Sequence, residues 1–298
     1  MNSFVRPSPL ETAPESRPVL KPESKPASTP ASTAGSPQSP ASGSRGRPNR
    51  ALGWVLPAVA LLLLEALVRT DVLQAHLFPA PSEIVRTLFD LGSGLAGHIG
   101  ISLARVAAGF AIGASLAVVA AVVVGLDRRA EALLDPSFQA LRAVPSLAWV
   151  PLLLLWLGID ETPKITLIAI GAFFPVYLNL LSGLRNVDRK LVELGEIYRL
   201  GRLALVRRIL LPASLPSLYT GLRVGLSLSW MFLVAAELIA ATRGLGYLLT
   251  DGRETSRPDI VLAAILLLAL LGKLSDSVLK SLETRALVWR DAFETRLA

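Results

Sequence analysis

The chain has 298 residues, a formal net charge of +7 and a mean hydropathy of +0.53. Several apolar runs reach about 20 residues, the length that crosses a bilayer core, so the sequence predicts an all-α polytopic membrane protein. The absence of Cys excludes disulfides and thiolate chemistry, and the two His stand far from any close acidic pair, which argues against a metal site.

Residues 1–50 are rich in Pro, Ser and Ala and contain few large apolar side chains. They cannot form a core, so we predict a disordered cytoplasmic tail, and the apolar run that follows is too late and too long for a signal peptide. Residues 51–290 are predicted to form the membrane domain, followed by a cytoplasmic C-terminus at 291–298. The six predicted spans are 52–68, 99–126, 136–157, 164–184, 217–241 and 259–282.

Proline residues mark two features of the predicted spans. Pro81 and Ser82 resemble a helix start, with Ser82 as the cap. Within the third span, Pro145 and Pro151 interrupt the backbone hydrogen bonds. Such interruptions either line a transport path or kink a helix for packing. If they line a path, Ser146 and Trp149 also contribute to it.

The charge of the connecting segments predicts the orientation in the membrane. The segment 185–212 is rich in Lys and Arg, whereas the turn GIDETP at 158–163 carries two acids. Because basic connectors stay in the cytoplasm, we place 185–212 and both termini on the cytoplasmic side. Topology and anionic lipid then explain the positive charge without a nucleic-acid partner. The seven basic residues of this segment are Arg185, Arg189, Lys190, Arg199, Arg202, Arg207 and Arg208.

Small residues occur at helical spacing in two spans, as the GxxxG pairs Gly109/Gly113 and Gly221/Gly225. Small residues allow helices to approach closely in lipid. Such pairs serve either packing within one chain or contact between two copies, and we favour packing within the chain.

Two charged residues lie inside predicted spans, Arg105 and Glu237. Charge in a span is costly, so it usually faces a cavity or an opposite charge. Glu237 therefore lines or gates a path, or pairs with Arg105, or is a structural or snorkelling side chain. Arg105 either steers an anionic substrate or anchors at the headgroups.

No motif for energy conversion or catalysis is present. The chain lacks a GxxxxGK[ST] phosphate loop, an HExxH pair and a GxSxG elbow. We therefore predict no catalytic residue, no cofactor and no metal in this chain. Uphill transport would need a partner or an ion gradient.

The segment 193–212 resembles the EAA loop of ABC-importer permeases, a cytoplasmic element that couples the permease to its ATPase. Arg199 stands at the position of the family's usual Gly, so either Gly201 provides the turn or the loop geometry differs. Arg207 and Arg208 would face an acidic groove of the ATPase. The loop residues that the resemblance assigns to coupling are Glu193, Gly195, Tyr198, Arg199, Gly201, Arg207, Arg208, Leu211 and Pro212.

Other segments extend this resemblance over about residues 78–290. They include SLAR at 102–105, the Pro-rich stretch 141–158 and LPSLYTGLR at 215–223. The nearest subgroup transports aliphatic sulfonates, taurine or nitrate. The pair Ala236-Glu237 and the segment GLGYL at 244–248 look most like aliphatic-sulfonate permeases.

The resemblance implies a permease homodimer in a bacterial inner membrane. Two cytosolic ATP-binding subunits would bind the ATP, and an extracytoplasmic protein would deliver the substrate. A gradient-driven secondary carrier is the main alternative, but the spans show no inverted repeat and few internal acids. A membrane enzyme is disfavoured, because no cluster of His, Asp or Glu lies at one membrane face.

Overall fold

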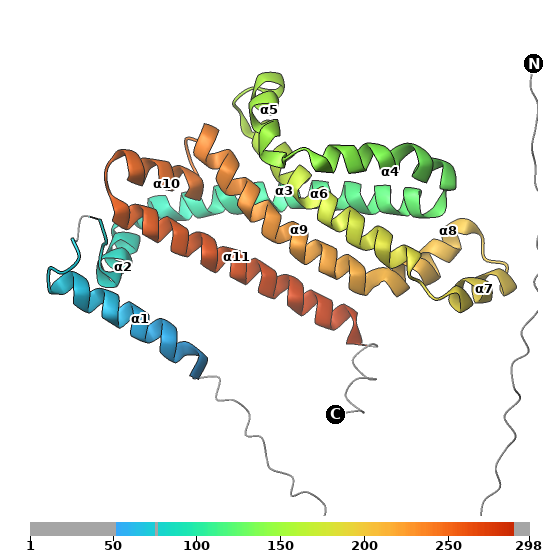
Figure 1. Cartoon of the computed structure of the whole chain (residues 1–298), viewed down its shortest axis with the longest axis horizontal. Coiled ribbons are helices and arrows are strands. Elements are labelled where there is room, and N and C mark those ends of the chain that lie inside the picture. The colour runs from blue at the N-terminus through green and yellow to red at the C-terminus, as the bar shows by residue number, and fades with distance from the viewer. Residues whose placement is uncertain (1–51, 75–76, 289–298) are drawn as a thin grey trace, which may run out of the picture. The chain divides into compact units, whose positions relative to one another are not determined.

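The computed structural model describes residues 52–74 and 77–288, and its regular elements there are all helical (Figure 1). The predicted tail at 1–50 and the predicted C-terminus at 291–298 lie outside the described residues. The elements are α1 (Leu52–Arg69), α2 (Pro81–Asp90), α3 (Gly92–Leu126), α4 (Arg128–Ala143), η1 (Ser146–Trp149), α5 (Val150–Leu157), α6 (Glu161–Arg185), α7 (Arg189–Ile197), α8 (Arg202–Leu205), η2 (Val206–Leu210), α9 (Leu211–Ala240), α10 (Leu245–Glu254) and α11 (Pro258–Ala286).

The helices α3, α6 and α9 form the core of the bundle, with α6 between the other two. On α3, Ala117 and Ala121 are fully buried against Val176 and Leu180 of α6. Alanine is small enough to let two helices approach closely, and the larger β-branched and leucine side chains fill the remaining space. This packing fixes the relative positions of residues far apart in the sequence.

The glycine pairs mediate contacts within the chain, as predicted. A Cβ on Gly109 would lie 2.6 Å from Ile168 Cβ, and a Cβ on Gly113 would collide with the main chain of Ala169. On α9, Gly221 and Gly225 meet Val176 and Ala172 of α6 in the same way. The two small-residue faces therefore hold α3 and α9 against α6.

Helix α11 packs against α9 through polar as well as apolar contacts. The Trp230 indole Nε1–H donates to Ser275 Oγ at 2.9 Å, and Arg223 Nε lies 2.9 Å from Asp276 Oδ1. These side chains thus provide hydrogen-bond partners for one another, which polar groups within a membrane bundle require because lipid offers none.

The structure does not confirm the predicted count of six spans. Among the described residues, four helices are long and apolar enough to cross a membrane, or five when a bent pair is counted as one span. The four are α3, α6, α9 together with α8 and η2, and α11. The predicted first span coincides with α1, whose 18 residues extend about 27 Å.

The third predicted span is corrected most. Its first helix, α4, begins at Arg128 rather than at 136, has no buried residue, and ends at Ala143. The chain then bends by 89° into η1 and α5. Val144 is extended because Pro145 disfavours a helical conformation in the residue before it. The break at Pro145 was expected, but Pro151 instead lies in the first turn of α5, where proline is tolerated.

The predicted cap of α2 is also corrected. Ala80 occupies the N-cap position and Pro81 begins the helix, whereas Ser82 donates from its backbone N–H and its hydroxyl to Glu65 of α1. A second polar contact joins α2 to α11, where the buried Thr87 hydroxyl donates to Asp259 at 2.7 Å.

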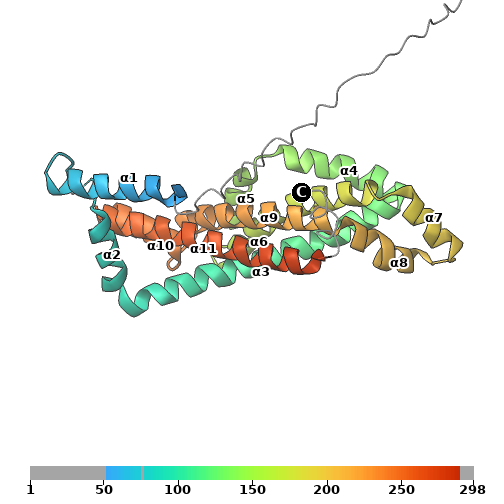
Figure 2. The same cartoon turned by 90° about the horizontal axis from the view of Figure 1, so that it is seen from below.

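Short helices lie at both ends of the bundle. In both views, α7 and α8 lie at one end, whereas α2 and α10 lie at the other (Figures 1 and 2). Helix α9 connects these ends, because it continues from α8 and η2 and finishes just before α10. The two candidate sites described next lie at these opposite ends.

Candidate functional site

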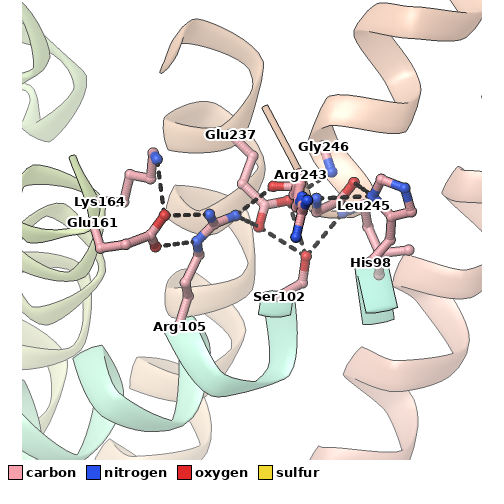
Figure 3. Close-up of polar contacts among 10 residues, drawn as sticks. His98, Ser102, Arg105, Glu161, Lys164, Glu237, Arg243, Leu245 and Gly246 are labelled. Carbon is pink, nitrogen blue, oxygen red and sulfur yellow. Dashed lines mark hydrogen bonds and ion pairs between the residues drawn. The ribbon is translucent and has the colours of Figure 1, made fainter. Parts of the chain in front are cut away.

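A network of charged side chains, all but one of them buried, joins three helices at the α10 end of the bundle (Figure 3). At its centre is Arg105 of α3, of which only 5% is exposed. Its Nη1 lies 2.7 Å from Glu237 Oε1 of α9, and its Nε and Nη2 each lie 2.5 Å from an oxygen of Glu161 of α6. Nη1 also donates to the backbone carbonyl of Arg243 at 2.7 Å. The guanidinium thus holds α3, α6, α9 and the connector to α10 together.

Glu237 binds the start of α10 as well as Arg105. The backbone N–H of Gly246 donates to Glu237 Oε2 at 2.7 Å, and the Ser102 hydroxyl donates to the same carboxylate at 2.8 Å. Ser102 Oγ in turn accepts from the N–H of Leu245 at 2.9 Å. The first amides of a helix lack partners within the helix, so Glu237 and Ser102 together cap α10.

Two glycines make room for this carboxylate. Gly244 has a φ of +126°, and a Cβ there would meet the Glu237 carboxylate. A Cβ on Gly246 would lie 2.5 Å from Glu237 Cβ. The GLGYL segment therefore has its glycines where the backbone of α10 must approach Glu237 most closely.

Glu161 is the exposed edge of the network. It lies in the first turn of α6, and its side chain is 55% exposed. Lys164, one turn on, is only 5% exposed and places Nζ 3.2 Å from Glu161 Oε1. Two cations and two carboxylates are thus joined in one row, and the network is formally neutral (Figure 3).

The sequence offered the Arg105–Glu237 pair as one alternative, and the structure shows it. It did not indicate that Glu161, Lys164 or Ser102 belong to the same cluster. The sequence does place Glu161 three residues before Lys164, which is the spacing of an ion pair on one face of a helix. This spacing predicts the ion pair between Glu161 and Lys164, but not that Arg105 also binds Glu161.

The other predicted path residues stand apart from this network. Pro145 and Ser146 lie at the bend between α4 and η1. Trp149 is half-buried and packs against an apolar cluster that includes Val150, Phe232 and Ala236. Within the described residues, no hydrogen bond or ion pair connects these positions with Arg105.

At the opposite end, α7 and α8 form a hairpin that contains the first five predicted coupling residues, from Glu193 to Gly201. Asp188 caps α7 by accepting from Lys190 N–H, and Glu193 pairs with Arg189 at 3.0 Å on its exposed face. Gly195 is buried, and a Cβ there would lie 2.5 Å from Leu205 Cδ1. The glycine thus allows the two arms of the hairpin to pack closely.

The turn of the hairpin uses Arg199 rather than Gly201. Arg199 adopts a left-handed φ of +50°, and the N–H of Leu200 donates to the carbonyl of Gly195 at 3.0 Å. The N–H of Arg199 donates to Glu196 at 2.8 Å, which completes a Schellman motif. Gly201 has an ordinary φ of −63° at the start of α8. The expectation that Gly201 could provide the turn is therefore wrong.

An Arg199→Gly substitution should stabilise this hairpin by about 1 kcal/mol, because an L-residue pays a steric cost in the left-handed conformation that glycine does not. Slower hydrogen exchange at the amides of α7 would report the gain. Gly201→Ala is the matched control and should change little. The φ of Gly201 suits any residue, and in the described part of the chain no neighbouring atom lies within 4 Å of its Cβ position. Destabilisation by Gly201→Ala, with no effect of Arg199→Gly, would contradict this assignment.

The surface of the hairpin is unusually apolar for an exposed element. Ile197, Tyr198 and Leu203 are 76%, 72% and 82% exposed. Arg207 and Arg208 are exposed on the following π-helical turn, and Leu211 and Pro212 begin α9 directly after it. Exposed apolar side chains beside basic ones are typical of a protein-binding surface.

Comparison with known proteins identifies the family to which this chain belongs. The family model described as binding-protein-dependent transport system inner membrane component matches residues 109–288. The chain is a permease of the ABC-importer family. This multi-pass membrane permease is 41% identical over 269 residues to the putative aliphatic sulfonates transport permease protein SsuC of Bacillus subtilis, covering 88% of this chain and 98% of that protein.

Two further relatives and one solved structure extend the comparison. The permease is 41% identical to the Escherichia coli protein of the same name, over 84% of this chain and 95% of that protein. It is 32% identical to the E. coli taurine transport system permease protein TauC, over 78% of this chain and 87% of that protein. A chain of the MetNI methionine ABC transporter, in inward-facing conformations, matches with a TM-score of 0.53 at 19% identity, covering 67% of this chain and 98% of that one. That likeness concerns the fold alone.

Proposed function

We propose that this permease forms the membrane path of an ATP-driven importer for small aliphatic sulfonates. The observation that carries the transport role is the α7–α8 hairpin, an exposed, partly apolar and basic element at one end of a membrane bundle. The relatives named for aliphatic sulfonates, which match over nearly their whole lengths, support the substrate class. Taurine is the second candidate, supported by the relative named for it.

The proposed assembly supplies what this chain lacks. Two copies would form the path, two cytosolic subunits would bind and hydrolyse ATP, and an extracytoplasmic protein would deliver the substrate. The chain itself would bind no cofactor and carry no catalytic residue. The excess of Lys and Arg in 185–212 supports a cytoplasmic hairpin, and an even number of spans would place both termini in the cytoplasm as well. The relatives from Bacillus subtilis and Escherichia coli support a place in a bacterial inner membrane.

The hairpin is suited to docking on an ATPase subunit. Ile197, Tyr198 and Leu203 can fill an apolar groove, and Arg207 and Arg208 can meet acidic side chains at its edge. Glu193, exposed on α7, provides a further polar contact. Such an interface needs a rigid element, and the close packing at Gly195 and the capped turn at Arg199 provide one.

Continuity of the chain would transmit the movement of the hairpin. Helix α8 continues through the π-helical turn η2 into α9 without a break, and α9 carries Glu237 near its far end. A displacement of the hairpin by the ATPase would therefore act along α9 on the Arg105 network. Rigid helices that rock between two packed arrangements are the common mechanism of such transitions.

Sulfur-limited growth tests this function. We expect that deletion of the gene abolishes growth on alkanesulfonates, that the wild-type gene restores it, and that Glu193→Ala lowers uptake about tenfold, the equivalent of about 1.4 kcal/mol of lost docking free energy. Glu193→Ala removes only an exposed ion pair, which contributes little to stability. A decrease in uptake at normal protein level therefore reports docking.

Glu196→Ala is the matched control, because Glu196 is exposed on the same helix three residues further on. It should leave uptake near the wild-type value. Rescue on taurine but not on alkanesulfonates would keep the importer and change the substrate. Growth that does not depend on the gene with either sulfur source would refute the proposed substrate class.

A further inference from the structure

The Arg105 network contains one carboxylate that is held differently from the other. Glu237 is fully buried and bound by Arg105, Ser102 and the N–H of Gly246. Glu161 is 55% exposed, and within the described residues its ion-pair partners are Arg105 and Lys164. One carboxylate is therefore part of the packed core, whereas the other lies against two buried cations from the solvent side.

The contact between Arg105 and Glu161 has the geometry by which a guanidinium binds a free oxyanion. Nε and Nη2 each donate to a different carboxylate oxygen, which is the bidentate arrangement of strong charge-assisted pairs. A sulfonate presents oxygens that can accept from the same two donors. The Glu161 carboxylate thus occupies a place that an anionic ligand could take.

Lys164 supplies the second half of such a site. It is buried, and within the described residues Glu161 is the one carboxylate within 4 Å of its ammonium group. Lys164 also borders a small apolar hollow of about 10 Å³ between α5, α6 and α9, where Val150, Leu153, Leu167 and Ala236 lie. The hollow has room for about one water-sized group, so these side chains form an apolar wall beside the cation and not a pocket for an alkyl chain.

Without Glu161, the charge of the cluster favours an anion. Among the described residues, Arg105 would then keep Glu237 as its ion-pair partner, whereas Lys164 would have no carboxylate within 4 Å. The two cations and one carboxylate leave one net positive charge. A buried, uncompensated charge is costly, so the cluster would need another anion. Because Glu161 is the exposed member in the first turn of α6, it can be displaced with the least disturbance of the core.

We propose that Arg105 and Lys164 form a binding site for the anionic head of an alkanesulfonate, and that Glu161 fills this site as a tethered substitute when substrate is absent. The inference rests on the proposed function, because it names the first contact of that substrate with the permease. When the sulfonate replaces the Glu161 carboxylate, Arg105 and Lys164 each keep an anionic partner. The site lies at the opposite end of the bundle from the hairpin, the end that the positive-inside rule assigns to the extracytoplasmic side.

Ligand binding to the purified full-length protein tests the proposal. The probe is ethanesulfonate at constant ionic strength, with uncharged ethanesulfonamide as the comparison, and the readout is the ligand-dependent shift in thermal unfolding in detergent. Glu161→Gln should bind ethanesulfonate about tenfold more tightly than the wild type, because the competing carboxylate is gone. Ethanesulfonamide should produce no shift in either protein.

Two further variants make the result specific. The double variant Glu161→Gln/Lys164→Gln should lose the gain, whereas Glu131→Gln, which removes an exposed carboxylate paired with Arg185 on other helices, should behave as the wild type. Equal binding by Glu161→Gln and the wild type, or a gain that survives the loss of Lys164, would overturn the site. Such a result would leave the growth experiment unaffected, so failure of the site and failure of the proposed function are distinguishable.

Discussion

Replacement of Arg105 by Met should destabilise the protein by about 3–5 kcal/mol, because it leaves the carboxylate of Glu237 buried without its cation. Among the described residues, Glu237 would keep the Ser102 hydroxyl and the Gly246 N–H as its hydrogen-bond partners. Two neutral donors do not offset the desolvation of a charge in a bundle core. We expect a strongly lowered unfolding temperature in detergent and little protein in the membrane.

A second substitution separates charge from packing in this experiment. Arg105→Met/Glu237→Gln removes both charges, and the Gln oxygen can still accept from Gly246 N–H at the start of α10. Replacing both members of a buried pair is far less costly than removing one, so the double variant should recover more than half of the lost stability. If it is as unstable as the single variant, the ion pair is not the reason for the loss.

Gly113→Ala should destabilise the bundle, although it adds only a single methyl group. The new Cβ would collide with the main chain of Ala169, whose Cα would lie 2.9 Å away. Main-chain atoms of a packed helix cannot rotate aside as a side chain can, so α3 and α6 must separate. Overpacking of this kind costs about 1–3 kcal/mol, and the unfolding temperature should fall accordingly.

Gly100→Ala on the same helix is the matched control. No neighbouring atom of the described residues lies within 4 Å of its Cβ position, and alanine favours a helix over glycine by about 1 kcal/mol. The control should therefore be neutral or stabilising, so the two substitutions have opposite signs. Equal effects at both positions would show that the close contact between α3 and α6 does not limit stability.

Much of the fold follows from local properties that a sequence displays directly. An apolar run of about 20 residues must be helical in a membrane, because each backbone amide then finds its partner within the run. The predicted spans at 164–184, 217–241 and 259–282 accordingly lie close to α6, α9 and α11. Hydropathy does not show the direction in which a helix runs. The sequence therefore predicted one interrupted span around Pro145, whereas the chain turns there by 89°.

In the hairpin, too, the sequence predicted the helical element but not the conformation of one residue in its turn. The segment 193–212 had enough of the family's pattern to predict a helical element with exposed basic residues. Its turn depended on which residue takes a left-handed φ, and glycine at position 201 was the sterically simpler choice. Arg199 takes it instead, because the Schellman bonds to Gly195 and Glu196 fix the chain at that position.

The sequence by itself determined that this protein is a multi-pass helical permease, because apolar length, charge between the spans and the coupling segment are each contiguous in the chain. Only the tertiary structure decided what the charged residues do. Arg105 lies 56 residues from Glu161 and 132 from Glu237, and packing of α3 and α9 against α6 brings them together. A charged residue within a span predicts that a partner of opposite charge is nearby, but only the packing of the helices determines which residue that partner is.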